Sequence, residues 1–200
     1  MPAQRKFDSC IMYVAMNINM KGTIDVAIGP MWAEKTTYAI SRLRKAEIVG
    51  KSALIILYSE DDRYGTEGII THSGIIYKGA DVDRMNSISP EKCKEIAANY
   101  SLVVIDEGQF FENVAESAQL LSSEGCDVVV TCLSGDFEQK MFPEVSKLIP
   151  YASKIHHFRA ICMKCKKNKA PYNIRLDKNN SEQKDIGGAD KYMSVCGSCL

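Results

Sequence analysis

The stretch TIDVAIGPMWAEKT, residues 23–36, decides the fold class of this chain. Residues 23–28 alternate in polarity and are rich in β-branched side chains, which predicts a β-strand. Residues 35–49 place apolar side chains at helical spacing, and Gly50 follows them as a closing residue, which predicts a helix. A strand that leads through a short loop into a helix is typical of an α/β fold.

The loop between this strand and helix is similar to a phosphate-binding loop. The pattern G-x-x-x-x-G-K-[ST] is matched at Gly29, Lys35 and Thr36, whereas Glu34 occupies the place of the second glycine. In such a loop the backbone N–H groups at a helix N-terminus bind phosphate, the lysine adds a positive charge and the hydroxyl reaches Mg²⁺. Short matches of this kind also arise by chance, so the assignment depends on the rest of the chain.

The rest of the chain repeats the alternation of strand and helix. Continuous apolar runs indicate strands that are covered on both faces, and the stretches between them have helical periodicity. We expect strands at 53–58, 102–105 and 127–133, helices at 90–100 and 114–124, and a long loop or hairpin at 61–79. This order predicts a doubly wound parallel sheet of the P-loop NTPase type. Short segments from about residue 154 onward predict a second, smaller lobe.

Two carboxylates end one of the predicted buried strands. The sequence VVIDE places Asp106 and Glu107 directly after an apolar run, where a magnesium-binding acid belongs in folds of this type. Glu107 is then a candidate general base for an acceptor hydroxyl. The alternative is that these acids only carry the chain from a buried strand into solvent.

Composition limits the classes of function. The 200 residues are 46% hydrophobic, with 25 Lys+Arg against 25 Asp+Glu. A net charge of zero provides no positive field for nucleic acid or an anionic membrane, which favours a small-molecule ligand. No apolar run reaches the roughly 18 residues of a membrane span, and the N-terminus lacks a clear signal peptide. We therefore expect a cytoplasmic protein that binds neither nucleic acid nor membrane.

Four of the eight cysteines form two C-x-x-C pairs that are separated by 30 residues. Two such pairs can complete a tetrahedral set of four thiolates for Zn²⁺, and no ligand position is left open for chemistry. The sequence predicts a structural zinc site formed by Cys162, Cys165, Cys196 and Cys199. Two disulfides, or reduced thiols without a metal, are the alternatives. The remaining cysteines occur singly, as small buried apolar residues do.

Several motifs that follow one another in order resemble the zinc-containing P-loop thymidine kinases of cells and poxviruses. They are GPM at 29–31, DRYGT at 62–66, TH at 71–72, IDEGQFF at 105–111, the pair at 162–165 and GGADKYMSVC at 187–196. The segment FEQKMFP at 137–143 is similar to the enzymes of other large DNA viruses. The resemblance covers about residues 22–200. It implies an N-terminal extension at 1–21, a P-loop kinase domain at 22–153 and a zinc-binding lasso domain at 154–200.

The resemblance implies transfer of a phosphoryl group from ATP to the 5′-hydroxyl of thymidine, with Mg²⁺ accompanying ATP and a structural Zn²⁺. Glu107 would be the base, Asp106 would hold Mg²⁺ through water, and Arg63 and Lys35 would act on the transferred group. The implied ATP and Mg²⁺ site comprises Gly29, Pro30, Met31, Trp32, Ala33, Glu34, Lys35, Thr36, Asp61, Asp62, Arg63, Asp106, Glu107, Gly108 and Gln109. The implied thymidine site comprises Met31, Phe110, Leu133, Phe137, Gln183, Lys184, Asp185, Ile186, Gly187 and Tyr192. Residues 183–187 match the lasso loop, and family members are usually homotetramers.

Some of these residues have plainer interpretations. Phe137, Phe142 and Tyr192 could be ordinary core residues, and His72 fits a role in ordering its loop better than one in catalysis. A zinc-ribbon nucleic-acid binder is disfavoured by the zero net charge.

Glu34 is the departure from the family that matters most. A side chain at this position should cost about 1–2 kcal/mol if the backbone takes positive φ. A carboxylate close to a phosphate adds repulsion of about 3 kcal/mol at an effective dielectric near 20. The alternative function is therefore an attenuated or non-catalytic relative that binds ligands without turnover.

Overall fold

A computed structural model of the chain describes residues 21–61, 68–177, 183 and 186–200. Its centre is a parallel sheet with the strand order β5-β2-β6-β7-β1-β8. The strands are β1 (Ile24–Gly29), β2 (Ala53–Tyr58), β5 (Asp81–Met85), β6 (Leu102–Ile105), β7 (Asp127–Leu133) and β8 (Lys154–His157). The predicted α/β fold class with a parallel sheet is confirmed.

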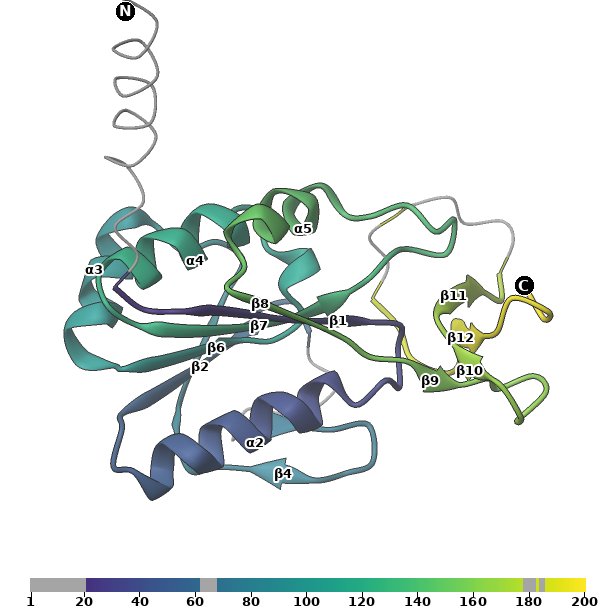
Figure 1. Ribbon diagram of the computed structural model, residues 1–200, viewed down its shortest axis with the longest axis horizontal. Helices are drawn as coiled ribbons and strands as arrows, with labels where there is room; N and C mark the ends of the chain where they lie inside the picture. Colours follow the sequence, from purple (N-terminus) through teal and green to yellow (C-terminus); the bar gives the residue numbers. More distant parts are fainter. Residues whose placement is uncertain (1–20, 62–67, 178–182, 184–185) are drawn as a thin grey trace, which may run out of the picture.

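Helices cover both faces of the sheet (Figure 1). One face carries α2 (Lys35–Ile48) beside the hairpin of β3 (Ile69–Ile70) and β4 (Ile76–Tyr77). The other face carries α3 (Pro90–Asn99), α4 (Val114–Ser123) and α5 (Pro143–Leu148). The two apolar cores lie on opposite faces, because side chains alternate along each strand. Of the described helices, none combines the length and the apolarity that crossing a membrane requires.

The ends of α2 and α3 follow from local sequence. Gly50 has φ 69° after α2, and its N–H donates to the Glu47 carbonyl at 3.0 Å, which confirms Gly50 as the closing residue. Before α3, the Ser89 hydroxyl accepts the Lys92 N–H at 3.2 Å, and Pro90 occupies the first turn, where it loses no hydrogen bond.

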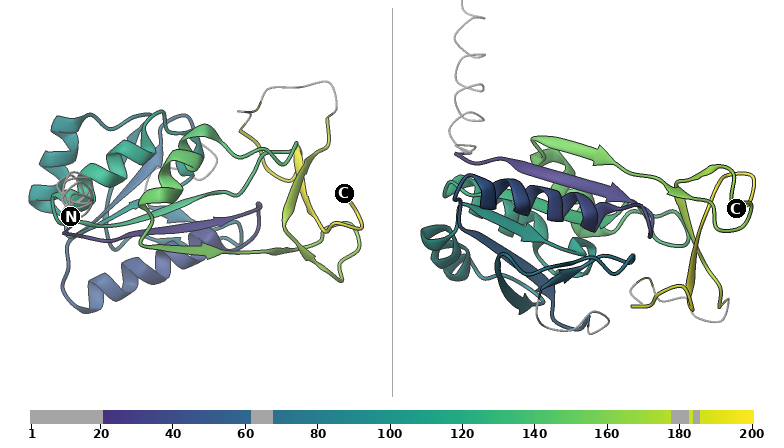
Figure 2. Two further views of the ribbon diagram at one scale, coloured as in Figure 1. Left: turned by 45° about the horizontal axis from the view of Figure 1, so that its top comes forward. Right: turned by 90° about the horizontal axis from the view of Figure 1, so that it is seen from below.

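The C-terminal lobe consists of two small antiparallel sheets beyond one end of the large sheet (Figure 2). They are formed by β9 (Ala160–Ile161) with β10 (Lys169–Ala170) and by β11 (Tyr172–Arg175) with β12 (Tyr192–Val195). The edge strand β8 pairs with β1, so the large sheet continues past residue 153. The boundary between the two domains at 153 stays a prediction.

Candidate active site

The segment from Gly29 to Thr36, called the 29–36 loop below, joins the carboxyl end of β1 to the first turn of α2. A Cβ on Gly29 would lie 2.8 Å from the Phe158 carbonyl oxygen, so only glycine fits there. The Lys35 ammonium is buried and donates to the Pro30 carbonyl at 2.8 Å. Burial lowers the pKa of Lys35, and the nearby charge of Glu107 opposes that shift. The loop therefore contains a cation that faces the acidic strand end.

Glu34 has φ 62° and ψ 21°, in the left-handed region that favours glycine. Its side chain is exposed and makes no capping hydrogen bond to α2. The expectation that this position requires positive φ is confirmed. Glu34 thus has a backbone conformation that costs a residue with a side chain about 1–2 kcal/mol relative to glycine.

A cavity of about 740 Å³, called the loop cavity below, opens over the N-terminus of α2. Its wall runs from Trp32 to Thr37 and includes the tip of the β3–β4 hairpin at Thr71, His72 and Ser73, together with Glu107. The Trp32 and His72 rings, which line this cavity from the loop and from the hairpin, have centroids 5.6 Å apart. Helix N–H groups, a lysine and hydroxyls in one cavity suit a polyphosphate ligand.

The two carboxylates at the end of β6 have different surroundings. Asp106 is buried and accepts a hydrogen bond from the Thr131 hydroxyl on β7. Burial, then the charge of Glu107, raises the pKa of Asp106 to about 7, and Lys35 opposes the shift. Glu107 has φ 56°, and its N–H donates to the Thr131 hydroxyl at 3.2 Å. Since Asp106 is buried, this pair does not simply carry the strand into solvent.

We expect Asp106→Asn to stabilise the ligand-free protein at pH 8, by about 1–3 kcal/mol. The folded-state pKa of Asp106 lies above the unfolded value. The stability that the protonated carboxyl contributes is therefore full below about pH 4 and is lost as pH rises through about 7. The Asn amide keeps the acceptor for Thr131 and does not titrate, so the gain over the parent should grow from pH 4 to pH 8. Denaturant unfolding at several pH values, without Mg²⁺, measures it.

Asp127→Asn is the control, because the stability that Asp127 contributes should change with pH in the opposite direction. Burial acts to raise the pKa of Asp127, but hydrogen bonds from Thr23 and Lys51 outweigh it and the pKa is lowered. The stability contributed by Asp127 is therefore present at neutral pH and lost in acid. An Asp106→Asn gain that does not change with pH would contradict the interpretation.

Gln109 connects the acidic strand end to the next strand. Its side-chain oxygen accepts the Leu133 N–H at 3.0 Å, and its amide donates to the Glu107 carboxylate at 2.7 Å. Gln109 is itself buried. The carboxylate of Glu107 is thus held in one orientation by a group fixed to β7. The assignment of Gln109 to the ATP and Mg²⁺ site stays a prediction; its side-chain hydrogen bonds in the structure are to Glu107 and Leu133.

A second cavity, of about 460 Å³ and called the aromatic cavity below, also has Glu107 in its wall. Its wall brings together most of the residues that the resemblance implied for thymidine. It is lined by Met31, Glu107, Gln109, Phe110, Leu133, Asp136, Phe137, Phe142, Asn173, Gln183, Gly187 and Tyr192. A largely apolar wall with a few polar groups is typical of a small-molecule site.

Other predicted site residues lie near these cavities or cannot be placed. Asp61 shares a third cavity with Thr36, Asp106 and Glu107. Ile186 packs against the large core, and Gly108 fits closely against β7. Asp62, Arg63, Lys184 and Asp185 lie outside the described residues.

Arg175, which sequence reasoning missed, contacts two side chains of this wall. Its guanidinium lies 4.1 Å from the Phe137 ring centroid and donates to the Tyr192 hydroxyl at 2.6 Å. This buried cation fixes two aromatic side chains of the cavity wall. Phe137 and Tyr192 therefore belong to the cavity and not only to a core.

Asp136 and Asn173 also line the aromatic cavity, and sequence reasoning did not single them out. Asp136 follows β7 by a few residues, and the carboxyl ends of parallel strands are where ligands bind, so that signal was available. Asp136 accepts the Gln183 amide at 2.7 Å, a contact with the predicted lasso. Asn173 lies on β11, and no local pattern marks it.

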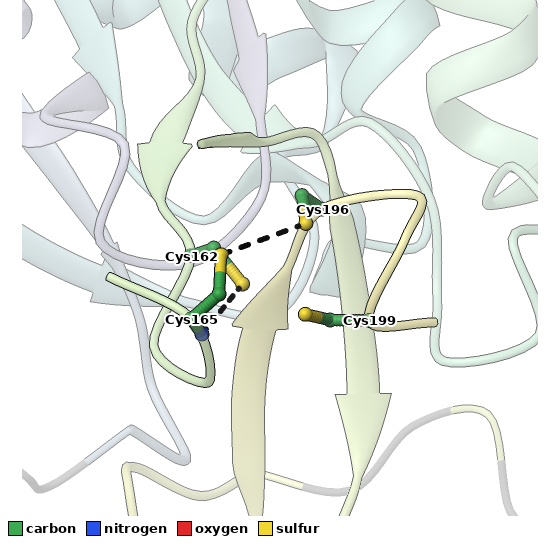
Figure 3. Close-up of side chains that lie close together, drawn as sticks. All are labelled: Cys162, Cys165, Cys196 and Cys199. Carbon is green, nitrogen blue, oxygen red and sulfur yellow. Dashed lines mark hydrogen bonds between the residues drawn. The ribbon is translucent and has the colours of Figure 1, made fainter. Parts of the chain in front are cut away.

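The four cysteines of the C-x-x-C pairs converge in the C-terminal lobe (Figure 3). Their sulfur atoms all lie within 4.8 Å of one another, and the Cys165 and Cys196 sulfurs are 3.8 Å apart. A tetrahedral zinc with Zn–S bonds of about 2.3 Å would place two sulfurs about 3.8 Å apart. A backbone N–H, that of Cys165, is the main cause that lowers the pKa of the Cys162 thiol to about 6, whereas burial raises the pKa of the Cys199 thiol to about 12. The donor set fits a structural Zn²⁺, and the four sulfurs are free thiols rather than disulfides.

Comparison with known proteins agrees with this geometry. A model of the thymidine kinase family matches residues 22–200. The thymidine kinase of rabbit fibroma virus (strain Kasza) is 36% identical over 178 residues, which cover 89% of this chain and 96% of that protein. The vaccinia virus (strain Ankara) thymidine kinase has the same identity and coverage. The thymidine kinase of Acanthamoeba polyphaga mimivirus is 35% identical over 186 residues, covering 89% of this chain and 81% of that protein. The chain therefore belongs to the thymidine kinase family.

Proposed function

We propose that this protein transfers the γ-phosphoryl group of Mg-ATP to the 5′-hydroxyl of thymidine, giving thymidine monophosphate and ADP. The observation that carries the proposal is the position of Glu107, which lies in the wall of both the loop cavity and the aromatic cavity. A base at that position can face an acceptor hydroxyl on one side and a phosphoryl donor on the other. Membership in the thymidine kinase family supports thymidine as the acceptor.

The residues of the 29–36 loop would bind the triphosphate. The N–H groups at the start of α2 and the Lys35 ammonium face the loop cavity, and both interact favourably with anionic oxygens. In the ligand-free protein Lys35 donates to the Pro30 carbonyl, so its ammonium would have to exchange this partner for phosphate. Asp106 and the Thr36 hydroxyl share one cavity wall and would hold the magnesium that accompanies ATP.

In the reaction, Glu107 would accept the proton of the 5′-hydroxyl while the 5′-oxygen of thymidine bonds to the γ-phosphorus. The bond from that phosphorus to the oxygen it shares with the β-phosphate breaks, and ADP leaves with that oxygen. The hydrogen bond from Gln109 would keep the Glu107 carboxylate turned toward the acceptor. Fixed orientation of this kind lowers the barrier because the reacting groups need not be ordered during the step.

The purified protein with labelled thymidine and Mg-ATP tests the reaction. Formation of labelled thymidine monophosphate that depends on both ATP and protein is the expected result. Binding of thymidine without any product would instead favour the alternative, an attenuated or non-catalytic member of the family. The observation that favours this alternative is Glu34, which lines the loop cavity with a carboxylate and takes a left-handed backbone.

Glu34→Gly should strengthen binding of Mg-ATP by about 2–4 kcal/mol, because it removes both backbone strain and repulsion of phosphate. Thymidine affinity should change far less, since Glu34 does not line the aromatic cavity. Calorimetric titration of each ligand into both proteins gives the comparison. Glu34→Gln is the matched control: it removes the charge but keeps the side chain, and should recover only the electrostatic part. Equal ATP affinities in all three proteins would contradict the argument.

We further propose a cytoplasmic homotetramer, on the strength of the family resemblance. Sedimentation velocity of the purified protein tests the oligomeric state, and a monomer at micromolar concentration would contradict it.

A further inference from the structure

We infer that Ser194 and Asn173 are positioning residues, which fix the 29–36 loop by binding the backbone of Met31 from the C-terminal lobe. This inference rests on the proposed function for its meaning in catalysis, but the anchoring itself can be measured without any nucleotide.

Both backbone groups of Met31 are held by side chains from another lobe. The Met31 N–H donates to Asn173 Oδ1 at 3.0 Å, and the Met31 carbonyl accepts the Ser194 hydroxyl at 2.8 Å. Ser194 Oγ and Asn173 Oδ1 are also 3.2 Å apart. All three residues are buried, with Ser194 fully so and Asn173 4% exposed. Buried hydrogen bonds of this kind are costly to break, because the groups left behind have no water to replace the partner.

The anchor is itself rigidly placed. Asn173 and Ser194 face each other in the register of β11 and β12. The Asn173 amide donates to the Gly135 carbonyl after β7 at 3.3 Å, and the Ser194 carbonyl accepts the Met163 N–H at 2.9 Å. Met163 lies between Cys162 and Cys165, so the anchor is joined directly to one of the cysteine turns.

Apolar packing supports the same connection. Ala33 of the 29–36 loop belongs to the small core of the C-terminal lobe, where Cys162, Val195 and Cys196 are buried with it, and Trp32 packs against this core. The loop is thus held at Met31 by hydrogen bonds and at Ala33 by packing.

Anchoring matters because the loop has an unfavourable conformation. Trp32 and Glu34 both have positive φ, at 57° and 62°. Left-handed backbone at residues with side chains persists only where the surroundings enforce it. Met31 directly precedes this strained stretch and also lines the aromatic cavity. The two anchors of Met31 therefore fix the shape of the loop that would bind the phosphate donor. They also fix the position of one wall residue of the aromatic cavity, where the acceptor would bind.

Ser194→Ala tests the inference, with Ser122→Ala as its control. Ser122 is also fully buried, and its hydroxyl donates to the Gly22 carbonyl at the same 2.8 Å, but it lies on α4 away from both cavities. Both variants remove a fully buried hydroxyl that donates to a backbone carbonyl, and both should lose stability in thermal unfolding. Only in Ser194→Ala does the lost bond hold the 29–36 loop.

The chain has a single tryptophan, and it lies in the loop as Trp32, so acrylamide quenching of its fluorescence reports loop mobility. Quenching should rise in Ser194→Ala and stay at the parent value in Ser122→Ala. Mg-ATP affinity, followed by the same fluorescence, should fall about tenfold in Ser194→Ala alone, with the KM for ATP rising more than kcat falls. Asn173→Ala removes the other anchor and provides the same test should Ser194→Ala not fold.

Parent-like quenching in Ser194→Ala, or an equal rise in both variants, would overturn the inference. Increased quenching with no nucleotide binding by any protein, parent included, would leave the anchoring intact and remove the proposed function. The two failures are therefore distinguishable.

Discussion

Glu107→Gln is expected to lower turnover by roughly 10²–10⁴-fold, because it removes the proposed general base. Affinity for Mg-ATP should stay close to that of the parent, since phosphate is to be bound by the 29–36 loop and Lys35. The local geometry should also survive, because the Gln109 amide can still donate to the new side-chain oxygen as it does to the carboxylate. Steady-state kinetics with labelled thymidine, together with calorimetric titration of Mg-ATP, separates loss of chemistry from loss of binding.

Glu112→Gln makes the same chemical change at an exposed position of the same connection and should leave kcat unchanged. A Glu107→Gln protein that turns over like its parent would show that another group takes the proton. Loss of ATP affinity with unchanged kcat would instead indicate that Glu107 helps to bind the metal and the phosphate.

Cys165→Ser is expected to remove the zinc and with it thymidine binding. The four sulfurs converge between β9 and β12, and a metal there would join two turns that no disulfide connects. The lobe buries little apolar surface of its own, and small lobes of this kind depend on a metal for much of their stability. Tyr192 and Asn173 of the aromatic cavity lie on its strands, so they should lose their places with the metal.

Elemental analysis should find one zinc for each parent chain and much less in Cys165→Ser, with a matching loss of thymidine binding in calorimetry. Cys126→Ser is the control, because Cys126 is also outside any disulfide but lies in the large domain. Its thiol donates to the Tyr100 carbonyl there. A parent protein without zinc, with free thiols at all eight cysteines, would refute the site.

The central strands could be predicted because they are buried on both faces and read as continuous apolar runs. The edge strand β5 has the sequence DVDRM and is partly exposed along its length, so hydrophobic patterning gave no signal for it. The helix α5 was also missed, since six residues are too few to establish a helical period. The sequence predicts a second lobe from about residue 154, where the segments become short, and in the structure residues 154–157 form β8, which pairs with β1.

In the candidate site, too, local sequence patterns marked some residues and missed others. Asp106, Glu107 and the 29–36 loop each belong to one short segment at a strand end, so local patterns found them. The Met31 anchors lie 142 and 163 positions along the chain from the residue they hold. Arg175 likewise acts through rings from two other segments. Partners this distant are chosen by tertiary packing, which no short pattern in a single sequence records.

The left-handed backbone of Glu34 has a genetic consequence. Glutamate codons GAA and GAG become the glycine codons GGA and GGG by a single transition, so glycine is within reach of one point mutation. Cells that depend on this gene for growth on external thymidine would enrich that mutant if the glutamate limits the enzyme. Deep sequencing of a randomised position 34 after such a selection would rank every residue at this position by fitness. Enrichment of glycine, followed by asparagine as another residue that tolerates the left-handed region, would identify backbone strain as the selected trait.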